Sequence, residues 1–215
     1  FFSVIMGMTG FTIALQKSEE ILKNPVEISP IVLWITLCFL ALITVAYVIK
    51  LIRYPHEVSQ EFNHPTRLSF FPTFSISLLL ISVAFLSVDI AVSKYFWIAG
   101  TLIHFLFTLK IISIWIQHTK FEMKHLSPAW FIPAVGNIIV PIAGVNHFSP
   151  EISWFFFSIG LMFWIILLVL FFNRAVFHAP LPDKLLPTLF ILIAPPSVGF
   201  ISYVKLSGAV NYFSK

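Results

Sequence analysis

The sequence predicts an all-α membrane protein built from helical hairpins, and three observations carry this prediction. Of its 215 residues, 59% are hydrophobic and 10% are charged, so lipid must cover apolar surface that no soluble core of this size could bury. The apolar residues lie in stretches of about 16 to 22, close to the roughly 20 residues that a helix needs to cross a bilayer. Residues 31–48 show no alternation of apolar and polar side chains, which argues against a transmembrane β-barrel.

Seven candidate spans follow one another along a single transmembrane domain, residues 1–215. They are 1–15, 31–51, 68–88, 95–116, 129–144, 152–172 and 185–204. The single cysteine, Cys38, lies inside the second span, so an intrachain disulfide is impossible. Phe1 begins inside an apolar stretch without an initiator methionine or a basic n-region, and we expect the natural chain to start upstream of it.

Helix-breaking residues distinguish odd spans from even spans. The even spans contain no proline and only isolated Gly100 and Gly160. The odd spans contain Gly7, Gly10, Pro72, Pro133, Gly136, Pro141, Pro187, Pro195, Pro196 and Gly199. Each pair of spans is therefore expected to form a hairpin of one interrupted helix and one smooth helix.

The breakers recur at a nearly constant spacing. Gly10, Pro72, Pro133 and Pro195 are separated by 62, 61 and 62 residues, about the length of two spans with their loops. This spacing indicates an internal repeat. The predicted units are roughly 1–53, 65–118, 127–174 and an incomplete 184–215.

The interrupted helices are expected to face inward, around a central pore. A proline inside a helix frees backbone groups, which are costly in hydrocarbon unless protein or water receives them. The pore-lining candidates are Gly10, Phe11, Pro72, Phe74, Ser75, Pro133, Asn137, Pro195, Ser197 and Phe200. Neutral donors and apolar constrictions without an acidic ring suit weakly hydrated anions. Serine and threonine also mediate helix packing in membranes, and this alternative stays open for each hydroxyl.

Basic residues predict the orientation, because they tend to stay on the cytoplasmic side. The loops and helix ends after the second, fourth and sixth spans hold eight of them, against five on the opposite side. With four and five acidic residues respectively, the two sides carry net charges of +4 and 0. We expect a cytoplasmic N-terminus and, for the location, a bacterial inner membrane.

The sequence contains few residues that could carry out catalysis within the membrane. Of the seven histidines only His104 lies well inside a span, and no metal-binding helix motif is present. We expect no enzymatic activity, no cofactor and no nucleic-acid partner. A membrane enzyme or metal-handling protein built on the histidine-bearing cytoplasmic loops is the alternative, with His118 and His125 as its candidates.

Short motifs resemble the tellurite-resistance/dicarboxylate transporter family, which includes bacterial tellurite-resistance proteins, malate transporters and plant slow-type anion channels. His-Pro-Thr-Arg-Leu-Ser-Phe at 64–70 is similar to the entry of that family's third helix. Ser-Pro-Ala-Trp-Phe-Ile-Pro-Ala-Val at 127–135 resembles its fifth helix, and Leu-Ile-Ala-Pro at 192–195 its seventh. Met-Gly-Met-Thr-Gly at 6–10 is similar to its first helix.

The resemblance implies ten helices as five hairpins around a pseudo-fivefold axis, usually assembled as a homotrimer. It implies a pathway for small inorganic anions, or alternatively a proton-coupled carrier of C4-dicarboxylates such as malate, or a tellurite-related carrier. The family's channel gate is a phenylalanine on the ninth helix. No gate residue is therefore expected among these residues, because about seven of the ten spans are present.

Overall fold

A computed structural model describes residues 2–23, 27–117 and 121–208, and every regular element in these ranges is helical. The predicted unit boundary at residue 118 and the last residues of the fourth unit lie outside the described ranges. The α-helices are α1 (Phe2–Leu22), α2 (Ser29–Arg53), α3 (Pro55–Asn63), α4 (Thr73–Phe85), α5 (Ile90–Gln117), α6 (Phe131–Val135), α7 (Val140–Gly144), α8 (Pro150–Phe177) and α9 (Ala194–Ser207). The 3-10 helices are η1 (Leu68–Phe70), η2 (Met123–His125), η3 (Pro128–Trp130), η4 (Gly136–Ile139) and η5 (Asp183–Ile193).

Five helical stretches of the described chain are long and apolar enough to cross a membrane, which agrees with an all-α, multi-pass membrane protein. They are Ser29–Arg53, Leu68–Phe85, Ile90–Gln117, Pro150–Phe177 and Asp183–Ser207. Two of the seven predicted spans fall short of this criterion. Pro128–Gly144 is a shorter apolar stretch, and α1 becomes polar after Leu15, so its apolar part is short.

Prolines divide the third odd span into short helical segments, whereas α1 contains no proline and runs unbroken from Phe2 to Leu22, so the prediction of an interrupted helix in the first odd span is wrong. Pro128–Gly144 passes through η3, α6, η4 and α7, with Pro128, Pro133 and Pro141 among its residues. Proline lacks the backbone donor and displaces the carbonyl four residues earlier, so the chain adopts alternative local bonding. A 3-10 segment rises about 2.0 Å per residue, against 1.5 Å in an α-helix, so these residues extend further than their number suggests. The even spans α5 and α8 run uninterrupted for 28 residues each.

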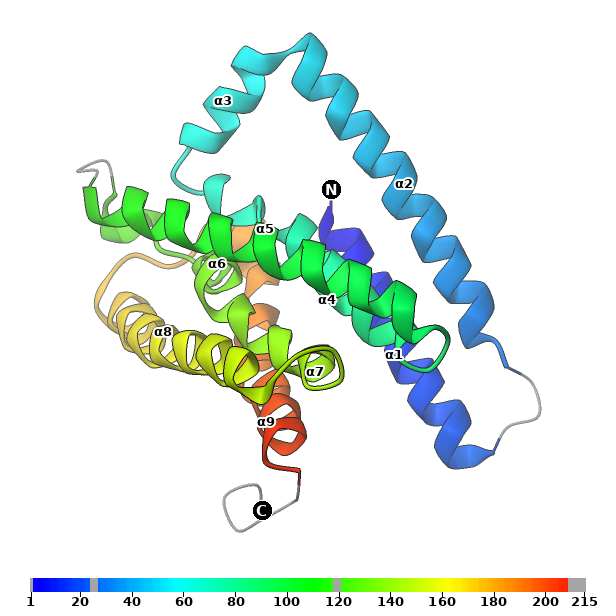
Figure 1. Ribbon diagram of the computed structural model, residues 1–215. Coiled ribbons are helices and arrows are strands. Elements are labelled where there is room, and N and C mark those ends of the chain that lie inside the picture. Colours follow the sequence, from blue (N-terminus) through cyan, green and yellow to red (C-terminus); the bar gives the residue numbers. More distant parts are fainter. Residues whose placement is uncertain (1, 24–26, 118–120, 209–215) are drawn as a thin grey trace.

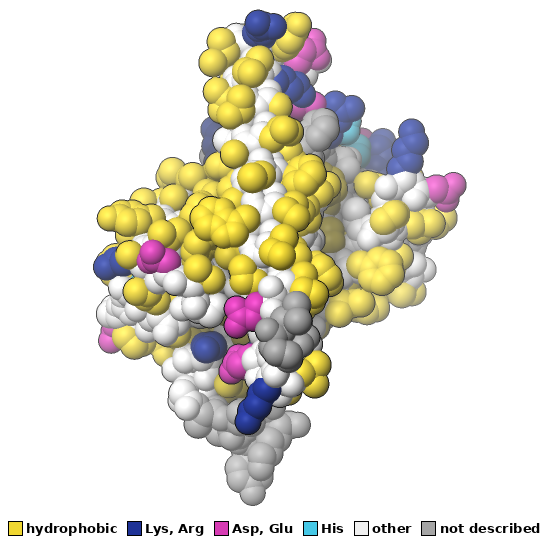
Figure 2. Space-filling view, turned by 90° about the vertical axis from the view of Figure 1, so that its right-hand side faces the viewer, with side chains coloured by type: hydrophobic (Ala, Val, Ile, Leu, Met, Phe, Trp, Pro, Cys, Tyr) yellow, Lys and Arg dark blue, Asp and Glu magenta, His cyan; other side chains and the backbone are white. Residues whose placement is uncertain are grey.

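The odd spans pack against one another in chain order, with the even spans outside them (Figure 1). α1 contacts α4, α4 contacts η4 and α7, and these two contact α9. Among the even spans, α2 packs on α1, α5 on α4, and α8 on the segments from α6 to α9. α4 and Pro128–Gly144 are largely buried, whereas α2 and α8 are mostly exposed. Figure 2 shows an apolar band along α2 with charged side chains at both ends, as expected for a lipid-facing helix.

Glycines on the even helices allow close contact with the odd spans. A Cβ atom at Gly100 of α5 would lie 3.1 Å from the backbone nitrogen of Leu79 on α4. A Cβ at Gly160 of α8 would lie 2.8 Å from the backbone nitrogen of Ile138 in η4. Small residues of this kind bring helix backbones together in membranes, and here they allow α5 to approach α4 and α8 to approach η4.

Candidate permeation pathway

The odd spans line an apolar cavity of about 70 Å³ that is open on one side. Its walls include Met6 of α1, Ile76 of α4, Ile139 of η4, and Pro195 and Val198 of α9. All four odd spans contribute, so the cavity lies where these spans converge. At roughly 30 Å³ per water molecule, it has room for about two water molecules. An apolar constriction of this size can control permeation by losing its water.

The three marker prolines are buried within the protein, and the carbonyl oxygens of two of them accept hydrogen bonds from hydroxyl groups. The Ser75 hydroxyl donates to the carbonyl oxygen of Pro72 over 2.8 Å. On α5, Oγ1 of Thr108 lies 2.7 Å from the carbonyl oxygen of Pro133. The carbonyl oxygen of Leu68, four residues before Pro72, accepts from the backbone nitrogen of Phe71 over 3.2 Å, so protein bonds the group that this proline frees.

Two of the candidate residues, Ser75 and Asn137, are directed towards α5. Oγ of Ser75 lies 3.0 Å from Nδ1 of His104, and the Asn137 amide donates to Oγ1 of Thr108 over 3.1 Å. All four side chains are buried. Within the described chain, Nε2 of His104 and Oδ1 of Asn137 have no hydrogen-bond partner. This polar cluster joins α5, an even span, to two odd spans. Helix packing, the alternative role considered for each hydroxyl, therefore explains the contacts of Ser75.

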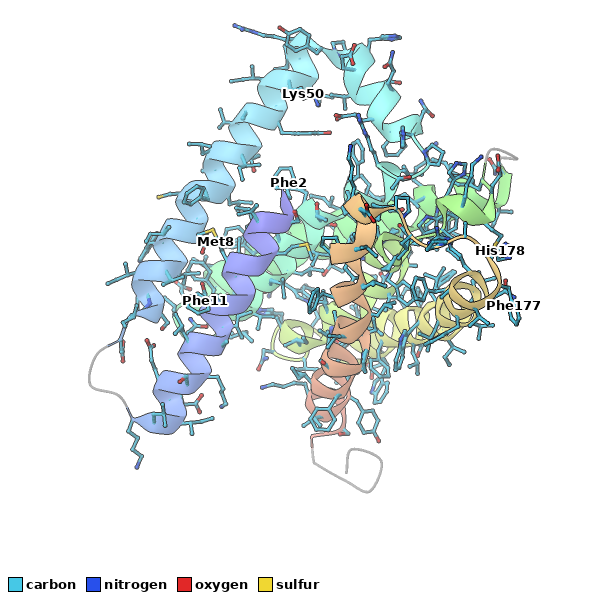
Figure 3. All side chains as sticks on the ribbon, turned by 180° about the vertical axis from the view of Figure 1, so that it is seen from behind. Phe2, Met8, Phe11, Lys50, Phe177 and His178 are labelled. Carbon is cyan, nitrogen blue, oxygen red and sulfur yellow. The ribbon has the colours of Figure 1, made fainter. Side chains whose placement is uncertain are left out.

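Four of the five candidates on the first and last odd spans are exposed, and the fifth, Pro195, is buried. The exposed four are Gly10 and Phe11 on α1, and Ser197 and Phe200 on α9. Phe2, Met8 and Phe11 follow one another along α1 (Figure 3). Phe74 is half-buried and lines a different cavity, beside α2. Of the ten candidates, Pro195 is the one that lines the apolar cavity, and the pore role of the others stays a prediction.

Charged groups lie around the helix ends, and among the described ones Arg174, near the end of α8, is buried. None of the described aspartates and glutamates is buried. Lys50 of α2 bonds to Glu61 of α3 over 2.9 Å, and Lys124 pairs with Glu122 over 2.8 Å. The hydrogen bond and charge of Lys124 hold the pKa of Glu122 below its usual value. The interior of the odd spans therefore presents no negative charge from the described acids that would repel an anion.

The part of the chain that the structure describes contains no candidate metal-binding site. No group of three histidine, cysteine or acidic side chains comes together there. His118, one of the two loop histidines considered for such a site, lies outside the described residues. His125 bonds locally, its Nδ1 accepting from the backbone nitrogen of Glu122 over 3.2 Å.

A comparison with protein families matches residues 1–214 to the SLAC1 model, described as a voltage-dependent anion channel. The chain belongs to the SLAC1 family. Two curated SLAC1-like relatives illustrate the similarity. The uncharacterized transporter MJ0762 of Methanocaldococcus jannaschii is 24% identical, covering 95% of this chain and 64% of the relative. The S-type anion channel SLAH2 of Arabidopsis thaliana is 29% identical, covering 95% of this chain and 40% of the relative.

A tellurite-resistance relative in the same set supports the resemblance that the short motifs suggested. The tellurite resistance protein TehA homolog of Haemophilus influenzae is 24% identical, covering all of this chain and 66% of the relative. The chain thus spans between about two fifths and two thirds of the length of these SLAC1-family relatives.

The sequence patterns did not predict that the even spans contribute polar side chains and close-packed glycines to this site. His104 was considered only as an isolated polar residue, and Gly100 and Gly160 only as isolated glycines. A signal was present, since Gly100, His104 and Thr108 recur every four residues and so share one face of α5. A polar and small face on an otherwise apolar helix indicates the side that packs against protein.

Proposed function

We propose that the full-length protein provides a pathway for small inorganic anions across the membrane. Membership of the SLAC1 family supports this proposal. The observation that carries it is the small apolar cavity to which all four odd spans contribute, together with the lack of a buried acid among the described residues. Such a lining neither repels a weakly hydrated anion nor binds it tightly, so the anion can enter and leave. No covalent chemistry is part of the proposal.

The proposal includes an arrangement in the cell. The protein lies in a bacterial inner membrane with a cytoplasmic N-terminus, which places the more basic loops inside. The four hairpin units surround the pathway, and three copies assemble in the bilayer. The largely exposed apolar faces of α2 and α8 supply surface for lipid or for neighbouring copies.

Matched substitutions at Ile139 test the pathway. Ile139 lines the apolar cavity, and Asn and Asp have nearly the same size, so only the charge differs between the two variants. In liposomes with an imposed chloride or nitrate gradient, we expect the wild type and I139N to conduct. We expect I139D to conduct at least about tenfold less, because a carboxylate at the constriction repels an anion. Equal anion flux through I139N and I139D, with both variants folded, contradicts the proposed route.

A coupled carrier is the second candidate, and the same liposomes distinguish it. Absence of chloride and nitrate flux, together with uptake of malate that depends on a proton gradient, would replace the passive pathway with proton-coupled dicarboxylate transport.

A further inference from the structure

A second and larger cavity lies between the first two hairpins. It has a volume of about 350 Å³ and is lined by side chains of α1, α2, α3, η1, α4 and α5. It shares no lining residue with the apolar cavity of the inner face. Phe2 at the start of α1 and Lys50 near the end of α2 mark this region in Figure 3.

Aromatic rings form much of the wall of this cavity. Phe2 makes edge-to-face contacts with Phe74 and Tyr47, at centroid distances of 4.9 and 5.9 Å. Tyr47 in turn makes an edge-to-face contact with Phe71 at 6.4 Å. The four rings, from α1, α2, the residue after η1, and α4, form one connected surface. Such a surface suits an aromatic ring or a short alkyl group.

Charged groups line another part of the cavity. Glu61 and Arg67 belong to the lining, and Oε1 of Glu61 accepts a hydrogen bond from Nζ of Lys50 over 2.9 Å. Nη1 of Arg67 lies 3.8 Å from the same oxygen, beyond hydrogen-bonding distance. One carboxylate thus faces two cations, leaving a net charge of +1. The Arg67 guanidinium keeps its donors for a further acceptor, and its planar fork matches a carboxylate.

We propose that this cavity binds a small amphipathic organic anion, whose carboxylate pairs with Arg67 and whose apolar body packs among the four rings. The volume lies near the lower limit of ligand pockets, about 300 Å³, so it accommodates a single ring or a short chain. A two-chain phospholipid is too large to be enclosed. The ligand is distinct from the transported ion, and it contacts α1 and α4 through Phe2 and Phe74.

Calorimetric titration of the purified full-length protein in detergent tests the site without any flux measurement, so its result is independent of the proposed function. The probes are 4-phenylbutyrate and the neutral 4-phenylbutanol, which share one apolar body. We expect the acid to bind at least about tenfold more tightly than the alcohol. Equal affinity for the two probes would overturn the proposed role of charge.

Substitutions of Arg67 and Glu61 identify the group that binds the carboxylate of the ligand. R67Q is expected to weaken phenylbutyrate binding by about tenfold, whereas R53Q, at an exposed arginine outside the lining, leaves it unchanged. E61Q is expected to strengthen binding, because it removes the competing carboxylate from beside Arg67. Weaker binding in E61Q, or equal loss in R67Q and R53Q, counts against the assignment.

A pair of substitutions on α2 tests the location. Val48 lines the cavity and Val45 does not, and both are about half exposed, so a larger side chain at either position leaves the fold intact. V48W is expected to abolish binding by filling the cavity, and V45W to retain it. Retained binding in V48W would place the ligand elsewhere. Native mass spectrometry that finds a copurified fatty acid in the wild type and in V45W, but not in V48W, would support the site and identify a lipid source.

Discussion

At the scale of single residues, Gly136 decides how closely an odd span meets α5. A Cβ atom at this position would lie 2.7 Å from Cε1 of His104 and 2.8 Å from Cδ1 of Ile76. His104 cannot easily move away, because its ring is buried and its Nδ1 lies 3.0 Å from Oγ of Ser75. The glycine is therefore required by the close approach of the helices, and its backbone dihedrals are ordinary helical ones.

Substitution of Gly136 measures this constraint. We expect G136A to destabilise the protein by about 1–3 kcal/mol, because overpacking a filled interior forces side chains and backbone to shift. Thermal unfolding in detergent, followed by circular dichroism, provides the measurement. G10A is the matched control, since a Cβ at Gly10 meets nothing within 4 Å and alanine favours a helix. Equal melting temperatures for G136A and G10A would contradict the packing role.

At the scale of elements, the first hairpin is joined by a side chain at its turn. The carboxylate of Glu19 on α1 accepts hydrogen bonds from the backbone nitrogens of Ile28 and Ser29 over 2.7 and 2.9 Å. These donors lie at the start of α2, where the first helical N–H groups lack partners within the helix. A negative charge there also interacts favourably with the helix dipole. Glu19 thus caps α2 from the neighbouring helix.

The cap predicts a pH-dependent stability. The hydrogen bond from the Ser29 side chain, followed by those from the Ser29 and Ile28 backbones, lowers the pKa of Glu19 from its ordinary 4.5. The folded state thus binds this proton more weakly than the unfolded state, so the cap stabilises the protein above pH 4.5 and is lost as the pH falls through the lowered pKa. We expect E19Q to lower the melting temperature at pH 7, with the difference from wild type shrinking on acidification.

The control for the cap is the neighbouring Glu20. Its carboxylate pairs with Lys17 over 2.8 Å on an exposed surface, where ion pairs contribute little. E20Q is therefore expected to leave the melting temperature nearly unchanged at both pH values. A loss in E20Q as large as that in E19Q would show that general surface charge, rather than the cap, is responsible.

At the scale of the whole molecule, the two middle odd spans form the buried interior, whereas the last odd span, Asp183–Ser207, is as exposed as the even helices α2 and α8. α4 is mostly buried, whereas α2 and α8 expose most of their apolar side chains. This division follows from backbone bonding, since a smooth α-helix satisfies its own groups and can face lipid, while an interrupted helix needs protein or water nearby. Figure 2 shows charged side chains beyond both ends of the apolar band along α2, and those of α2 itself, Lys50 and Arg53, lie in its last turn.

Single-cysteine labelling tests the proposed orientation. Cys38 is the sole cysteine, so a C38S background allows one new thiol at a time. Asn146, before α8, and His178, after it, are exposed loop positions at opposite ends of that helix. We expect an impermeant maleimide to label N146C on intact cells, and H178C only after permeabilisation. The reverse pattern would invert the topology, and labelling of both positions on intact cells would contradict a membrane crossing by α8.

The sequence by itself determined the class of the protein, the broken helix at Pro128–Gly144 and the family, whereas the glycines of α1 did not interrupt that helix. Composition and span length reflect whether a segment faces lipid or water, and a proline changes backbone bonding within about one helical turn. Both signals can therefore be interpreted without knowledge of contacts between distant residues. The motifs around Pro72, Pro133 and Pro195 were sufficient for the family for the same reason. The number of spans was predicted less accurately than the class, because Pro128–Gly144 alternates between helix types and α1 becomes polar after Leu15.

Only the tertiary structure decided which polar and aromatic side chains contact one another. Ser75 and His104 are 29 residues apart, and Lys50 and Glu61 are 11 apart across a helix boundary. Local periodicity indicates the face on which such a side chain lies, but not the helix against which that face packs. Helix contacts in lipid depend on small residues and a few polar bonds rather than on a strong apolar pattern, since lipid chains are as apolar as the core. The polar cluster at His104 and the aromatic cavity beside Arg67 therefore become visible only once the hairpins are packed.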